Sequence, residues 1–259
     1  MGFSSAMMSG VSGLMANDTS LTVIGNNIAN SDTYGFKSGR TLFEDLLYTD
    51  VIGNKSQVGH GTSVLAVQNQ FSQGSVIPAD NATDMAISGD GFFVVQDNSA
   101  TPVTKFTRAG IFNLDSKAQY LVNPNGDKLC DISGAVIDLT SLKVSSISNI
   151  SSDGTISYLD ATGAENTSTI QIGLAKFKNI YGLDKQGGND YLATADSGIA
   201  VTAAADQDTK ILSKTLEQSN VDMATQLTSM ITTQRAYSAN SKSVTTSDEM
   251  TKTVIDMKR

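Results

Sequence analysis

The carboxy-terminal segment from Leu216 to Arg259 constrains the fold of this chain more than any other stretch. It contains neither glycine nor proline, so nothing in it interrupts a helix. A helix from residue 220 to residue 257 would be about 57 Å long at the usual rise per residue. One narrow apolar stripe on one face of such a long helix needs a partner. The stripe recurs every seven positions, at Leu216, Met223, Met230, Tyr237 and Val244, with Leu227 between two of them.

A matching stripe lies near the amino terminus, within residues 3–30. Glycines at positions 10, 13 and 25 each weaken a helix there by about 1 kcal/mol relative to alanine, so this helix also depends on packing. The common period predicts that the two terminal helices pair as a coiled-coil stem. The alternative is that two ordinary amphipathic helices dock separately on a core. The stripe residues are Met7, Leu14, Leu21 and Ile28, with Val11 and Ile24 between them.

The residues between the two predicted helices have the pattern of β structure. Short stretches alternate apolar and polar side chains, and turn sequences at Asp90-Gly91, residues 123–126 and Asp153-Gly154 each predict a hairpin. The expected fold class is α+β, with long N- and C-terminal helices forming the stem and a mainly-β domain between them. We expect a helical domain of residues 1–34 and 216–259, a linker segment of residues 35–70 and a mainly-β outer domain of residues 71–215.

The amino-acid composition argues against several kinds of function. The formal net charge of −8 argues against nucleic-acid binding, because such proteins usually carry a basic patch. No stretch approaches the roughly 20 apolar residues of a membrane span. The first basic residue is Lys37, so we expect no secretory signal at the amino terminus, and export would need another machine. Cys130 is the only cysteine, which precludes an internal disulfide.

The sequence offers no set of residues suited to catalysis or metal binding. His60 is the only histidine and lies between two glycines, so a histidine-based triad or zinc site would lack partners. The Gly89-Asp90-Gly91 run precedes no helical pattern and therefore matches no nucleotide-binding motif. The aspartates of the turns are not spaced as a calcium loop. We expect a protein that is not an enzyme and has no cofactor or metal.

Several blocks of the chain resemble the bacterial flagellar rod and hook protein family. Residues 23–40 resemble its amino-terminal signature, NN-x-AN-x-x-T-x-GFK. Further blocks at residues 86–95, 106–115, 174–191 and 216–250 follow in the family order, so the resemblance extends from end to end. The signature positions are Asn26, Asn27, Ala29, Asn30, Thr33, Gly35, Phe36 and Lys37.

This resemblance implies a structural subunit that is exported through the flagellar type III apparatus and serves motility. Family members assemble as a helical tube, with the terminal helices in an inner coiled-coil layer and the β domains outside. The stripe residues of both helices are therefore the candidate assembly seam. The implied partners are further copies of the chain and the neighbouring axial proteins, namely the rod, the hook cap and the hook–filament junction. The implied location is the hook or basal body, in the extracellular or periplasmic space after export.

Within the family, the resemblance favours a short hook protein, which acts as a universal joint. Residues 2–14 and 230–242 are similar to hook sequences, and the chain lacks an insertion that distal rod proteins carry after the Leu47-Tyr48 position. The alternative is a distal rod subunit, part of the drive shaft, whose length is close to that of this chain. A remote alternative is a secreted β-rich adhesin with a helical stalk.

Overall fold

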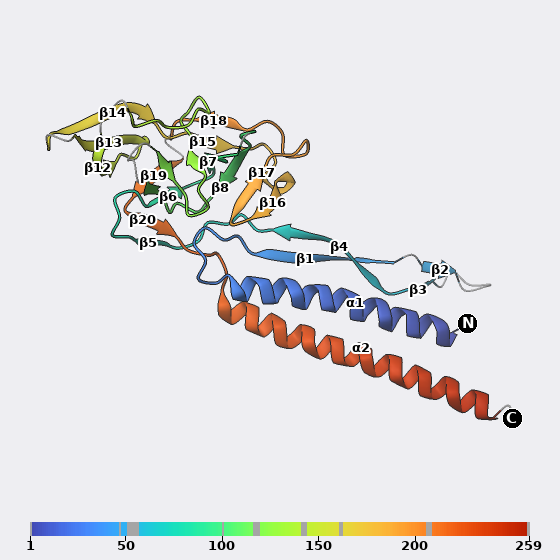
Figure 1. Ribbon diagram of the computed structural model, residues 1–259. Helices are drawn as coiled ribbons and strands as arrows, with labels where there is room; N and C mark the ends of the chain where they lie inside the picture. The colour runs from blue at the N-terminus through green and yellow to red at the C-terminus, as the bar shows by residue number, and fades with distance from the viewer. Residues whose placement is uncertain are drawn as a thin grey trace. The chain divides into compact units, whose positions relative to one another are not determined.

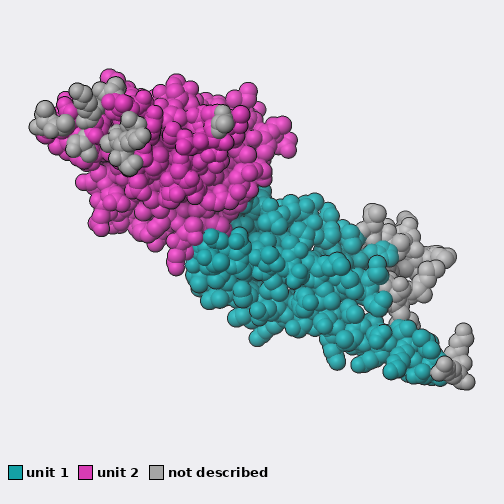
Figure 2. All heavy atoms as spheres, viewed as in Figure 1, with its two compact units in different colours: residues 1–31, 38–70, 221–259 teal, residues 32–37, 71–220 magenta. Residues whose placement is uncertain are grey.

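The computed structural model describes residues 2–46, 48–50, 57–99, 101–115, 120–140, 144–160, 163–205 and 209–257. The chain divides into two compact units, coloured separately in Figure 2. Helices at the two ends of the chain flank the strands, which confirms the α+β class (Figure 1). Unit 1 comprises residues 1–31, 38–70 and 221–259, and unit 2 comprises residues 32–37 and 71–220.

Unit 1 is built on two long helices, α1 (Gly2–Ala29) and α2 (Met223–Met257). They run side by side in opposite directions (Figure 1), since Gly10 near the start of α1 lies against Val244 near the end of α2. Asp222 caps α2: its Oδ1 accepts a hydrogen bond from the Ala224 backbone N–H at 3.0 Å. A carboxylate at this position satisfies a free N–H and suits the positive end of the helix dipole.

A two-stranded antiparallel ribbon completes unit 1 and packs against α1. It consists of β1 (Gly39–Asp45) and β4 (Thr62–Asn69), with a bulge between Leu42 and Phe43. A shorter pair, β2 (Tyr48–Asp50) and β3 (Gln57–Gly59), follows β1 along the chain. Most of the stretch that we expected to be a linker therefore contains strands and groups with the helices.

Unit 2 is a mainly-β domain with a nine-stranded sheet at its centre. Seven strands follow one path: β16 (Asp184–Gly187), β17 (Asp190–Leu192), β8 (Thr104–Thr107), β7 (Phe92–Gln96), β11 (Lys128–Leu129), β10 (Leu121–Val122) and β9 (Asn113–Leu114). Off this path, β15 (Leu174–Lys176) pairs with β7 and with β18 (Val201–Ala203). A separate three-stranded sheet contains β12 (Val144–Ile150), β13 (Thr155–Asp160) and β14 (Glu165–Gln171). The other described strands of unit 2 form two pairs. One pair is β6 (Met85–Ser88) with β19 (Lys210–Ser213), and the other is β5 (Val76–Pro78) with β20 (Thr215–Glu217).

Two apolar clusters fill unit 2. The larger is mainly aliphatic and includes Met85, Phe93, Leu129, Ile156 and Ile211. The second is aromatic and is centred on Phe92 and Tyr191, whose ring centroids are 5.7 Å apart. Because the side chains of β7 alternate, Phe92 and Val94 enter the second cluster while Phe93 and Val95 enter the first.

Two of the three predicted hairpins are confirmed. Val122 of β10 pairs with Lys128 of β11 across the turn at residues 123–126, and β12 pairs with β13 across Asp153-Gly154. The hairpin predicted at Asp90-Gly91 is wrong, because β6 pairs with β19 whereas β7 pairs with other strands of the large sheet. The Asp90 carbonyl instead accepts a hydrogen bond from the Thr209 hydroxyl at 2.9 Å, which ties this turn to the segment before β19.

Leu216 does not lie on the carboxy-terminal helix, contrary to the seven-residue series. It is buried in β20, where its backbone pairs with Ile77 of β5. The strand ladder accounts for this difference, since pairing with β5 satisfies backbone groups that a longer helix would have to bond internally. The helix begins one heptad later, at Met223.

Candidate functional site

The contact between α1 and α2 uses small side chains. On α1 the buried positions include Gly10, Gly13 and Ala16. A Cβ atom added to Gly10 would lie 2.7 Å from Val244 Cγ2, and one added to Gly13 would lie 2.7 Å from Asn240 Nδ2. At both positions the nearest atom that the Cβ would meet belongs to a side chain of α2, so a larger residue would fit only if Val244 or Asn240 shifted. The helices pair, but a regular coiled coil with the predicted stripe at its centre is not confirmed.

The candidate seam residues divide into two groups according to their exposure. Ile24 is buried, and Val11, Leu14, Leu21, Ile28, Met230 and Val244 are half-buried. Met7, Met223, Leu227 and Tyr237 are exposed, with Leu227 at 47%. The exposed group continues on α2 with further large apolar side chains at Ile231, Met250, Val254, Ile255 and Met257. A long helix thus presents apolar side chains that no described residue of this chain covers.

The first half of the family signature lies at the end of α1, where Asn27 is buried. Its Nδ2 donates to the Gly39 carbonyl at 2.8 Å and its Oδ1 accepts from the Gly39 N–H at 2.9 Å. Nδ2 also reaches Gln226 Oε1 at 3.2 Å, so one amide connects α1, β1 and α2. Asn30 Nδ2 donates to the carbonyl of Asn26 at 2.9 Å and stabilises the last turn of the helix, whereas Ala29 is exposed.

The second half of the signature, residues 32–37, belongs to unit 2. Gly35 has φ +70°, and a Cβ at this position would lie 2.5 Å from the backbone nitrogen of Ala109, so only glycine fits without strain. The Gly35 N–H donates to the Glu217 carbonyl at 2.8 Å, and the Thr33 carbonyl accepts from the Phe36 N–H. The Phe36 ring is buried, and Lys185 Nζ lies 4.2 Å from its centroid.

Lys37 ends the signature and is fully buried in an ion cluster. Its Nζ is 2.6 Å from Glu217 Oε1 and donates to the Ser72 carbonyl at 2.8 Å. The other carboxylate oxygen of Glu217 lies 3.4 Å from Arg108 Nη1, and Oε1 also accepts from the Gly74 N–H at 2.9 Å. Burial lowers the pKa of Lys37 and of Arg108, and the carboxylate of Glu217 opposes this by stabilising both cations.

This cluster joins two segments of unit 2 that are far apart in the sequence. Lys37 is the last residue of the amino-terminal signature, and Glu217 ends β20 just before the carboxy-terminal helix segment. Sequence reasoning identified Lys37 as a signature residue but missed Glu217 and Arg108. Both residues have a polar residue beside them in the sequence, so no local signal distinguished them from exposed charges.

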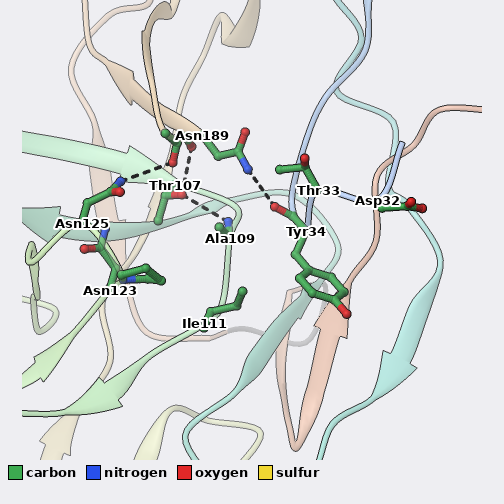
Figure 3. Close-up of a pocket in the computed structure, with 11 residues that line it drawn as sticks. Asp32, Thr33, Tyr34, Thr107, Ala109, Ile111, Asn123, Asn125 and Asn189 are labelled. Carbon is green, nitrogen blue, oxygen red and sulfur yellow. Dashed lines mark hydrogen bonds between the residues drawn. The ribbon is translucent and has the colours of Figure 1, made fainter. Parts of the chain in front are cut away.

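A shallow pocket of about 230 Å³ lies beside the signature turn of unit 2 (Figure 3). Asn189 links its walls: its side-chain amide donates to the Tyr34 carbonyl at 2.8 Å and its own carbonyl accepts from the Thr107 hydroxyl at 2.9 Å. The lining is mostly neutral and brings together no group of residues typical of catalysis. It comprises Asp32, Thr33, Tyr34, Thr107, Ala109, Ile111, Asn123, Pro124, Asn125, Gly188 and Asn189.

Other polar groups of the described chain also show no catalytic arrangement. Burial raises the pKa of the Cys130 thiol to about 11, so it is not a thiolate near neutral pH. None of the described helices is long and apolar enough to cross a membrane.

Three family models match the chain in order. Residues 7–37 match the flagella basal body rod protein model, residues 86–158 match the flagellar hook protein FlgE/F/G D1 domain, and residues 212–257 match the flagellar basal body rod FlgEFG protein C-terminal model. The flagellar basal-body rod protein FlgG of Bacillus subtilis is 37% identical over 98% of this chain and 99% of its own length. The chain belongs to the flagellar rod and hook family. It is a structural protein of the bacterial flagellum.

Further relatives distinguish a rod protein from a hook protein. FlgG of Borreliella burgdorferi is 34% identical, with 98% of both chains covered. The flagellar hook protein FlgE of the same organism is 35% identical, but over only 64% of this chain and 39% of its own length. The preference for a hook protein is therefore not supported, and the rod alternative fits the comparisons better.

Proposed function

We propose that this chain is a subunit of the flagellar basal-body rod, corresponding to the distal rod alternative, and that it polymerises into part of the axial tube. The observation that carries this proposal is the end-to-end match with rod proteins named FlgG, over 98% of this chain and 99% of the Bacillus subtilis protein. The hook relative covers much less of both chains, because more than half of its length has no counterpart here.

The exposed apolar side chains of α2 support self-assembly. A helix that leaves Leu227, Ile231 and Val254 about half exposed has a large apolar surface for contacts with other subunits. We propose that the candidate seam residues of this helix, together with its other exposed apolar side chains such as Ile231, pack against further copies of the chain. A different part of α2 contacts α1 within the same subunit, where Val244 and Asn240 lie against Gly10 and Gly13.

The test is deletion of the gene in its host, followed by electron microscopy of purified basal bodies. We expect short rods without hooks in the deletion strain, and complete rods with hooks when the wild-type gene is restored. Complete rods that lack only the hook would instead assign the chain to the hook. Normal flagella in the deletion strain would contradict a role in the axial structure.

We further propose that the chain leaves the cytoplasm through the flagellar type III apparatus and lies among neighbouring axial proteins. This proposal is supported by family membership. A strain whose flagellar export apparatus is inactive should retain the chain in the cytoplasm. Release of the chain from such a strain at the normal rate would refute this route.

A further inference from the structure

Two buried carboxyl groups lie in one region of unit 2, beside the pocket but outside the ion cluster of Lys37. Asp190 begins β17 and is 3% exposed, and Asp127 precedes β11 and is 2% exposed. Asn125, two residues before Asp127, donates from its side-chain amide to Asp190 Oδ2 at 3.3 Å, which brings the two segments together. Two ionised carboxylates in one buried region repel each other, and neither can donate a hydrogen bond.

The surroundings distinguish the two groups. Lys105 of β8 lies 3.4 Å from Asp127 Oδ2 and 3.9 Å from Asp97, so a cation compensates the charge of Asp127. Asp127 also accepts from the Asn123 amide at 3.4 Å. Asp190 takes part in none of the ion pairs among the described residues. Its Oδ2 accepts from Asn125 Nδ2 at 3.3 Å, but its Oδ1 is buried and has no hydrogen-bond partner in the described part of the chain.

A proton on Asp190 would remove this conflict. Protonation of Asp190 removes its buried charge and turns one of its oxygens into a hydrogen-bond donor. We propose that Asp190 holds a proton in the folded chain and that this proton makes the turn before β17 sensitive to pH. Burial and the charge of Asp127 raise the pKa of Asp190 to about 6, and the amide of Asn125 and the charge of Lys105 oppose the shift. Tyr191, the next residue, is buried and stays neutral because burial raises its pKa, while the charges of Arg108 and Glu217 act on it in opposite directions.

Asn189 connects Asp190 to the signature turn of residues 32–37. Asn189 immediately precedes Asp190, has φ +64° and donates to the Tyr34 carbonyl at 2.8 Å. Asp190 itself pairs with Thr107 of β8, whose hydroxyl donates to the Asn189 carbonyl. Loss of the proton places an uncompensated charge in this turn, so the support for residues 32–34 weakens as the pH rises.

The sign of the effect follows from linkage. Because the folded pKa of Asp190 lies above the ordinary value of 3.8, the folded state binds the proton more tightly, and stability from this group increases as the pH falls through 6. Between pH 8 and pH 5 this group alone should lower the unfolding equilibrium constant by about tenfold. The proposal concerns the stability of the chain itself, so its test does not depend on which flagellar part the chain forms.

The test is urea unfolding of the dilute full-length chain at pH 5 to 8, followed by circular dichroism. Asp190→Asn keeps the shape of the side chain and supplies an amide N–H donor in place of the carboxyl O–H, but it cannot titrate. The ratio of the wild-type unfolding constant to that of this variant should rise about tenfold from pH 5 to pH 8. Asp184→Asn removes an exposed carboxylate from the neighbouring β16 and should leave the ratio to wild type unchanged over this range. A constant ratio for Asp190→Asn would overturn the proposal.

Two further measurements test the proposal beyond the pH dependence of the Asp190→Asn variant. Asp127→Asn removes the partner's charge, so the pH dependence should shrink in this variant even if Asp190→Asn does not fold. An unchanged pH dependence in Asp127→Asn would overturn the role of the Asp127 charge in holding the proton on Asp190. Calcium chloride at pH 8 should have no effect that depends on Asp190. Stabilisation by calcium of the wild type, but not of Asp190→Asn, would show that the pair holds a metal cation instead of a proton.

Discussion

Replacing Glu217 with glutamine tests the buried ion cluster at the end of the family signature. With an effective dielectric constant of about 20, the attraction between Glu217 and Lys37 at 2.6 Å is about 6 kcal/mol, and that between Glu217 and Arg108 at 3.4 Å is about 5 kcal/mol. Desolvation of the three groups offsets much of this gain. Glu217→Gln removes the carboxylate and leaves two buried cations, so the free energy of unfolding should fall by roughly 3–5 kcal/mol.

Urea unfolding followed by far-ultraviolet circular dichroism measures this loss. Glu165→Gln is the matched control, because Glu165 is exposed on β14 and accepts one bond from Ser148; its effect should stay within about 0.5 kcal/mol. Burial lowers the pKa of Lys37, and Glu217→Gln removes the carboxylate charge that opposes that shift. The folded variant therefore releases the Lys37 proton more readily than the unfolded chain, and its stability should partly recover as the pH rises. Equal unfolding midpoints for the two variants would refute a role of the cluster in stability.

Three other substitutions or truncations test the turn and the helices. Gly35→Ala should lower the free energy of unfolding by roughly 1–3 kcal/mol because of backbone strain, and by a further amount because of the clash with Ala109. Gly187 also has a positive φ, of +95°, but a Cβ there would meet only open space, so Gly187→Ala tests the strain alone. An equal loss for the two variants in urea unfolding would exclude the clash. Met230→Asp should raise the concentration needed for assembly at least about tenfold, because burying an unpaired carboxylate costs several kcal/mol. Ser238→Asp, at an exposed position, should not, and similar sedimentation of the two variants would contradict the proposed seam. Removal of residues 223–259 should abolish tubes while leaving a cooperative β unfolding transition, and tubes from the truncated chain would refute the role of α2.

The terminal helices could be predicted from the sequence because periodicity and the lack of helix breakers act locally. The residues that α1 and α2 bring into contact could not be predicted in the same way. Hydrophobicity indicated Met7 and Leu14, whereas Gly10 and Gly13 also lie directly against side chains of α2, which an apolar pattern cannot show because glycine carries no side chain.

Strand pairing could likewise be predicted where a local turn specifies it, but not where the paired strands are distant in the sequence. The turn at residues 123–126 specifies its hairpin by its own residues, and so does Asp153-Gly154. Asp90-Gly91 has an equally strong turn sequence, but β6 pairs with β19, more than one hundred residues later in the chain. Glu217 also could not be assigned a role, because its partners Lys37 and Arg108 are distant in sequence and meet only in the folded unit.

The glycine contact between α1 and α2 has a consequence for how this chain tolerates mutation. At many protein interfaces large side chains such as Trp, Tyr and Arg carry most of the binding energy. Here the contact residues on α1 include Gly10 and Gly13, and a methyl group at either position would lie 2.7 Å from a side-chain atom of α2, so a larger residue requires that side chain to shift. Met8 and Met15 are more than half exposed on the same helix, so packing within one subunit constrains them less. The effect of a substitution at either glycine should therefore depend on which residues stand at positions 240 and 244.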